Sequence, residues 1–127
     1  MNTIQAYVVS VEFTDTISQV KLSTELGDFY CIVLENPNTV DYLKVGKSVK
    51  LIFKENDFIF SKEKIFKINT FEGEIKSITF GEIFSAINFQ AKNYQFSAIL
   101  SKYEAEDFKV DDKIYIYIKP TNIILEV

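Results

Sequence analysis

Two lysines stand at positions where chemistry is possible. Lys54 and Lys119 each end a segment of alternating apolar and polar residues, and each is followed by a polar stretch. A lysine at the end of a strand is usually only a solvated cap, so the alternative is that these two serve a binding site. The chain offers little to an enzyme: it has no histidine, no nucleophile with a recognisable partner and no glycine-rich phosphate loop. We therefore predict a non-catalytic protein with no catalytic and no metal-ligating residues.

Composition narrows the class of protein further. The 127 residues carry a net charge of −4, which is opposite to the basic footprint of a nucleic-acid binder. All 14 cations are lysines, so no bidentate arginine clamp can form. A single cysteine, Cys31, excludes an intramolecular disulfide and fits a reducing compartment. No apolar run reaches about 20 residues and no leader opens the chain, so we expect a cytoplasmic protein without membrane or nucleic-acid contact.

The chain repeats itself. The pattern that begins at Asn2-Thr3 recurs at Asn69-Thr70, an offset of 67, and the pattern around Leu43-Lys44-Val45-Gly46 recurs at Phe108-Lys109-Val110-Asp111, an offset of 65. This predicts two tandem units, residues 1–64 and residues 65–127. Because a unit of that size buries little surface alone, we expect the two units to share an interface or the protein to oligomerise.

Each unit reads as five short strands. The alternation is rich in Val, Ile, Phe and Tyr and is broken by turn residues. A segment that can form one or two helical turns follows the third strand of each unit, at residues 38–43 and 101–108. In the second of these segments, Ser101 with Glu104 forms a capping-box signature. The predicted fold class is all-β: two tandem OB-like five-stranded Greek-key barrels, each with a short helical turn after the third strand.

Aromatic residues are abundant, at 15% of the chain. Barrels of this class can stack nucleic-acid bases on aromatic platforms, but the phase of the strands favours a core or subunit-contact role. That role is predicted for Phe13, Phe53, Phe80, Phe89 and Phe96. Tyr115 and Tyr117 lie out of phase with their apolar neighbours, which suggests an interface.

A family resemblance enters with the second unit. Gly73-x-Ile75-x-x-Ile78-x-x-Gly81, then residues 96–101 and the run from Phe108 to Leu125, resemble the Mop domain of molybdate-binding proteins, within the wider TOBE class. The first unit matches more loosely, through residues 43–60. The resemblance implies a molbindin-like tandem: a cytoplasmic molybdate or tungstate store or sensor, assembled as a homo-oligomer, with a trimer favoured and a dimer possible.

The resemblance also implies a site at protomer boundaries. A tetrahedral dianion has only acceptor oxygens, so its pocket needs N–H and O–H donors and positive charge. Backbone amides would act with Lys119, Thr121, Asn122 and Asn69, and Lys54 and Asn2 are the counterparts in the first unit. The family's Ser-Ala-Arg-Asn-like stretch is represented here only by its asparagine. Glu55 and Asp57 place carboxylates beside Lys54, so the second unit is the better candidate.

Two functions follow from these residues. In the first, the protein binds molybdate or tungstate as its ligand for storage or sensing, and the spacing around Lys119 favours it. In the second, a degenerate TOBE tandem acts as a regulatory or protein-interaction module without bound anion, which the missing Ser-Ala-Arg stretch favours.

Overall fold

The protein consists of two lobes, each built on one antiparallel five-stranded sheet. The computed structural model describes residues 2–127, so Met1, the first residue of the predicted 1–64 unit, lies outside the described residues. The first lobe has the strand order β10 (Ile124–Glu126), β4 (Ser48–Phe53), β1 (Asn2–Phe13), β2 (Ser18–Thr24), β3 (Gly27–Val33). The second has the order β5 (Ile59–Ser61), β9 (Lys113–Tyr117), β6 (Thr70–Thr79), β7 (Phe84–Ala91), β8 (Tyr94–Ser101). The curled sheets confirm the predicted all-β, OB-like class.

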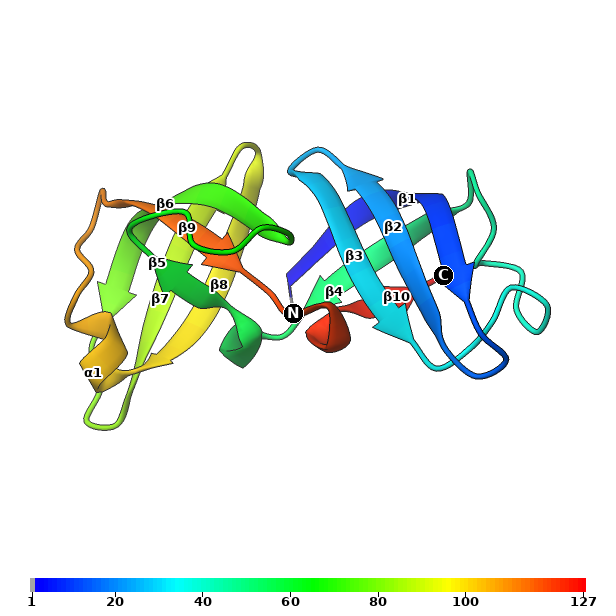
Figure 1. The fold of residues 1–127 in the computed structure, drawn as a ribbon. Coiled ribbons are helices and arrows are strands. Elements are labelled where there is room, and N and C mark those ends of the chain that lie inside the picture. Colours follow the sequence, from blue (N-terminus) through cyan, green and yellow to red (C-terminus); the bar gives the residue numbers. More distant parts are fainter. Residues whose placement is uncertain (1) are drawn as a thin grey trace.

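The lobes exchange their last strands. β5 belongs by sequence to residues 1–64 but pairs with β9, and the C-terminal β10 pairs with β4. Figure 1 shows this exchange, with red β10 in the lobe of blue β1 and green β5 in the other lobe. The chain passes from one lobe to the other through a lysine and a 3-10 turn. We call Lys54 with η1 (Glu55–Asp57) the first crossing and Lys119 with η2 (Pro120–Asn122) the second crossing. A division of the chain at residue 64 therefore stays a prediction about sequence repeats, because both sheets draw strands from both sides of it.

The apolar core is continuous across the two lobes. Phe29 of β3 lies 5.9 Å from Phe71 of β6, measured between ring centroids, and Phe53 of β4 lies 6.1 Å from Phe96 of β8. Edge-on aromatic contacts of this kind add to the stabilisation that burial alone provides. The expectation that two small units share an interface is met by this core.

Repeat symmetry extends to irregular backbone. The register of β1 against β2 shifts between Val8 and Ser10, and that of β6 against β7 shifts between Ile75 and Ser77, at positions 67 residues apart.

Of the phenylalanines predicted for the core or a subunit contact, Phe53, Phe89 and Phe96 are buried, whereas Phe13 and Phe80 lie beyond these bulges and are exposed. The core role is therefore wrong for the last two, because both strands run past the edge of the core.

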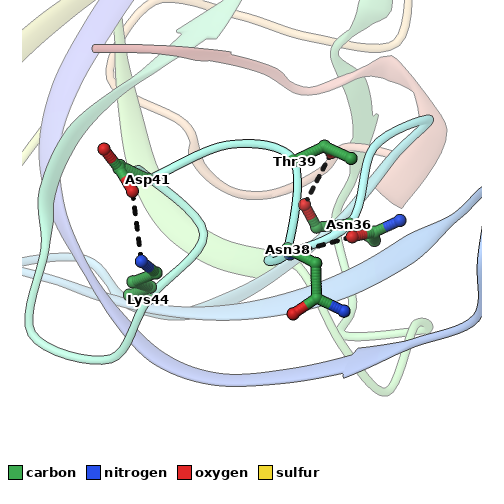
Figure 2. Close-up of polar contacts among 5 residues, drawn as sticks. All are labelled: Asn36, Asn38, Thr39, Asp41 and Lys44. Carbon is green, nitrogen blue, oxygen red and sulfur yellow. Dashed lines mark hydrogen bonds and ion pairs between the residues drawn. The ribbon is translucent and has the colours of Figure 1, made fainter.

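The segment after the third strand differs between the lobes. In the second lobe it contains α1 (Lys102–Ala105), which has the predicted capping box of Ser101 and Glu104. In the first lobe, residues 34–47 form turns where we predicted a helical turn. Asn36 explains the difference, since its side chain accepts from the Asn38 backbone N–H at 2.8 Å and its carbonyl accepts from the Thr39 hydroxyl at 3.0 Å (Figure 2). Asparagine side chains that bond to nearby backbone in this way compete with helix formation.

Asp41 and Lys44 complete the turn of the first lobe. The Lys44 ammonium lies 3.1 Å from the Asp41 carboxylate. Figure 2 shows the two side chains pointing toward each other. The hydrogen bond from Lys44 lowers the pKa of the Asp41 carboxyl. The pair is exposed and contributes little to stability.

Within residues 2–127, no helix has the length and apolar character needed to cross a membrane.

Candidate functional site

The second crossing presents unpaired polar side chains to solvent. Lys119 is the residue before η2, has extended backbone, and precedes Pro120 at the first position of the turn. Lys119 and Thr121 are exposed, and Asn122 is half-buried. Among the described residues, none of these three side chains has a hydrogen bond or an ion pair. The sequence-predicted donors Lys119, Thr121 and Asn122 are thus brought together in one short segment, with their donors free.

The first crossing has a similar backbone, but a carboxylate compensates the charge of its lysine. Lys54 precedes η1 with a similar extended conformation. Its ammonium lies 3.9 Å from the carboxylate of Asp57, whose side chain is only 15% exposed. The Asp57 Oδ2 atom is buried without a hydrogen-bond partner. An anion at this crossing would meet a buried carboxylate. At about 4 Å and an effective dielectric of about 20, such like-charge contact costs about 4 kcal/mol.

Two acids distinguish the crossings electrostatically: Glu55 and Asp57 of the first crossing stand where the second has Pro120 and Asn122. Asp57 and Asn122 occupy equivalent positions, three residues after Lys54 and Lys119, respectively. Asparagine has nearly the shape of aspartate but carries no charge and adds an N–H₂ donor. Lys119 therefore keeps an uncompensated charge at a position where Lys54 has an acidic partner.

Asn2 and Asn69 join the lobes. The Asn69 amide donates to the carbonyls of Tyr30 and Ile118 at 2.8 and 2.9 Å, and its oxygen accepts from the Tyr30 N–H at 2.7 Å. Asn2 bonds in the same way to the N–H and carbonyl of Ser97, at 2.8 and 2.9 Å. Asn2 begins β1 and Asn69 directly precedes β6, and each bonds to the third strand of the other repeat. We call this pair the asparagine clasps.

The clasps limit what these asparagines can offer a ligand. Asn69 is 1% exposed and donates both amide hydrogens to backbone carbonyls. Asn2 is 7% exposed, and its amide also donates to the Phe53 carbonyl at 3.2 Å. Their side chains therefore position the crossings, since Ile118 directly precedes Lys119 and Phe53 directly precedes Lys54.

Two open clefts lie away from the second crossing. A cleft of about 470 Å³ contains Lys67 and Lys21 beside Tyr30, and its two cations were not among the predicted site residues. A larger groove of about 790 Å³ has lysines and glutamates together in its lining. Neither is lined by Lys119, Thr121 or Asn122, and at the second crossing Lys119 and Thr121 are exposed to solvent. Because clefts depend on residues far apart in sequence, no spacing in the chain signals them.

The remaining predictions concern a tyrosine, the single cysteine and metal binding. Tyr117 is half-buried and stacks on Phe66 with ring centroids 3.9 Å apart, so one face of its ring is already in contact with another residue of the chain. Cys31 is buried, and burial raises the pKa of its thiol to about 12. No group of three or more metal-ligating side chains occurs among the residues that the structure describes.

Comparison with known proteins places the fold. No protein-family model matches the chain, and no curated protein matches its sequence. The architecture of two OB-like half-barrels nevertheless has a counterpart among solved structures. It superposes on the cytoplasmic molybdate-binding protein ModG, in a crystal form with molybdate bound, with a TM-score of 0.87. The match covers 99% of this chain and 95% of that chain at 18% identity, and it confirms the predicted resemblance at the level of the fold.

Two other solved structures align over most of the chain with much lower similarity. One is a murine DNA-binding protein bound to double-stranded DNA, with a TM-score of 0.35 and 11% identity. The other comes from work on abrogation of activation of pro-inflammatory cytokines, with a TM-score of 0.32 and 7% identity. Superpositions this poor carry no argument about fold or function.

Proposed function

We propose that this protein is a non-catalytic binder of molybdate or tungstate, and that the anion is held at the second crossing. The observation that carries the proposal is the uncompensated Lys119, beside Thr121 and Asn122, on the fold of a molybdate-binding protein. Lys119 supplies charge, and the Thr121 hydroxyl and the Asn122 amide supply donors for acceptor-only oxygens. Backbone amides of the crossing complete the donor set.

The openness of the second crossing supports a site shared between copies. An exposed lysine interacts with an anion across high-dielectric solvent, and salt screens that attraction. A second protomer packed over Lys119 would exclude water and strengthen each donor. We therefore propose a homo-oligomer, as a trimer or a dimer, with the anion at the protomer boundary. Storage or sensing inside the cell is the role that such a site fits.

The asparagine clasps favour a second candidate function. Because Asn2 and Asn69 have no free amide hydrogen, and the Ser-Ala-Arg part of the family stretch is missing, the tandem can instead act as a regulatory or protein-interaction module without bound anion. The two candidates differ in whether a metal oxyanion stabilises the folded protein.

Thermal melting with molybdate, tungstate, sulfate or no anion tests the proposal. A specific ligand at about 100 times its dissociation constant stabilises the fold by about 2.7 kcal/mol, which is roughly 10 °C for a chain of this size. We expect this shift with molybdate or tungstate and a much smaller one with sulfate. Lys119→Ala should abolish the shift, and the matched Lys54→Ala should retain it.

The contrary results are equally definite. Absence of a shift with both metal oxyanions would leave the module without anion as the function. A shift that survives Lys119→Ala would place the anion elsewhere, with the Lys21 and Lys67 cleft as the next candidate. Light scattering with and without molybdate reports the assembly: a monomer that binds molybdate would refute the protomer-boundary site.

A further inference from the structure

An apolar patch lies at the far end of the second lobe. It consists of Phe80, Ile83, Phe84 and Tyr103, whose exposed fractions are 61%, 69%, 63% and 70%, and we call it the β6–β7 patch. Large apolar side chains scattered singly are ordinary on a surface, but a contiguous group marks an interaction site. The question is therefore whether these four residues are neighbours.

Backbone contacts bring together the two segments that carry these residues. Ile83 accepts a hydrogen bond at its carbonyl from the Lys102 N–H, at 2.9 Å. Phe84 pairs with Ser101 across β7 and β8, and Tyr103 lies two residues further on, in α1. Phe80 directly follows β6, on the other side of the same turn. Figure 1 shows α1 beside the turn between β6 and β7, at the end of the lobe away from the first lobe.

The patch has an acidic rim. The turn contributes Glu82, and α1 with the residues after it contributes Glu104, Glu106 and Asp107, all exposed. Lys102 is the one cation within residues 80–84 and 101–107, and its ammonium lies 5.0 Å from the centroid of the Tyr103 ring. These two segments together carry a net charge of −3, from four acids and one lysine, against −4 for the whole chain.

This charge decides between the possible occupants. A second copy meeting the patch with its own patch would bring two acidic rims together. The equivalent end of the first lobe, with exposed Phe13, is flanked by Glu12 and Asp15 and would also repel it. An anionic lipid surface or a nucleic acid is disfavoured for the same reason. We infer that the β6–β7 patch docks a protein partner through a segment whose apolar side chains are flanked by lysine or arginine.

Such a partner fits the usual composition of interfaces. Aromatic residues dominate the centre of an interface, and charges at its rim set the association rate and the choice of partner. Phe80, Phe84 and Tyr103 supply the centre, and Glu82, Glu106 and Asp107 the rim. The inference does not depend on the proposed anion, because the patch contains no residue of either crossing.

Peptide binding tests the inference. The probe is a fluorescent amphipathic helical peptide of leucine and lysine, compared with a matched peptide of leucine and glutamate. We expect only the lysine peptide to bind in fluorescence anisotropy, with amide shifts in NMR spectra confined to residues 80–84 and 101–107. Affinity should fall as salt is raised to about 0.5 M, because the rim charges are then screened.

Surface variants make the test specific. Phe80→Ser with Phe84→Ser should weaken binding at least tenfold, since buried aromatic anchors carry much of an interface's affinity. Glu106→Gln with Asp107→Asn should weaken it several-fold and flatten the salt dependence. Val45→Ser is the matched control: Val45 is 72% exposed in a loop of the first lobe, and its loss should leave binding unchanged.

Several results would overturn the inference. These are absence of binding by the lysine peptide, equal binding of the glutamate peptide, or equal weakening by Val45→Ser. Light scattering gives another: if the doubly substituted Phe80 and Phe84 variant lost an assembly that the wild-type chain forms, the occupant would be a second copy. Far-ultraviolet circular dichroism confirms that each variant is folded.

Discussion

Removal of one asparagine clasp should loosen the junction between the lobes. Asn69 makes three hydrogen bonds of 2.7 to 2.9 Å to Tyr30 and Ile118. At about 1 kcal/mol for each net hydrogen bond, their loss costs about 3 kcal/mol. Asn69 also has a φ of 53°, a left-handed conformation that costs alanine a further 1–2 kcal/mol or so. Asn69→Gly removes the bonds without that strain, so it isolates their contribution.

Urea unfolding measures the difference. We expect the free energy of unfolding to fall by about 3 kcal/mol in Asn69→Gly and by about 4–5 kcal/mol in Asn69→Ala. Asn2→Ala should cost about 3 kcal/mol, because Asn2 makes two hydrogen bonds to Ser97 and one to Phe53 and lies in the extended strand β1. A loss below about 1 kcal/mol in Asn69→Gly would refute the clasp, and equal losses in the glycine and alanine variants would refute the strain argument.

Further predictions concern charge, reactivity and packing. Asn122→Asp should abolish molybdate binding, measured by titration calorimetry, because it gives Lys119 the acidic partner that Lys54 has at the first crossing; retained affinity would remove Lys119 from the site. Cys31 should resist a thiol reagent at pH 8 until the protein unfolds. Burial raises its pKa to about 12 from the ordinary value of 9.0, so stability should fall as pH rises above 9. Cys31→Ala should reduce that fall, and Tyr42, whose pKa burial raises from 10.0 to about 12, contributes to what remains. Gly73→Ala should cost about 1–3 kcal/mol in urea unfolding, because its Cβ would lie 2.8 Å from Ile116 Cδ1; unchanged stability would mean that Ile116 moves freely aside.

Much of the fold could be predicted because the sequence states it twice. Period-two alternation marks ten strands, and the recurrence of Asn2 at Asn69 locates the start of each repeat. The exchange of β5 and β10 could not be predicted, because the same alternating pattern fits an edge strand in either lobe. Which lobe receives the strand depends on the direction of the chain at η1 and η2, and short turn segments do not specify this direction.

Only part of the candidate site could be predicted from the sequence. Spacing pointed to Lys119 and Lys54, and the acids at 55 and 57 indicated which crossing is compensated, as the ion pair between Lys54 and Asp57 shows. The full use of the Asn69 amide could not be foreseen, because its partners Tyr30 and Ile118 lie 39 and 49 residues away. A polar residue that recurs at the strand start of both repeats can bond to the backbone as readily as to a ligand.

The most direct test is a crystal structure of the protein grown with molybdate, with the metal located by anomalous scattering. The account predicts a peak at the second crossing, within hydrogen-bond reach of the Lys119 ammonium and the Thr121 hydroxyl, with another protomer closing the site. A peak at the first crossing, in the cleft of Lys21 and Lys67, or nowhere in a crystal saturated with molybdate would contradict it.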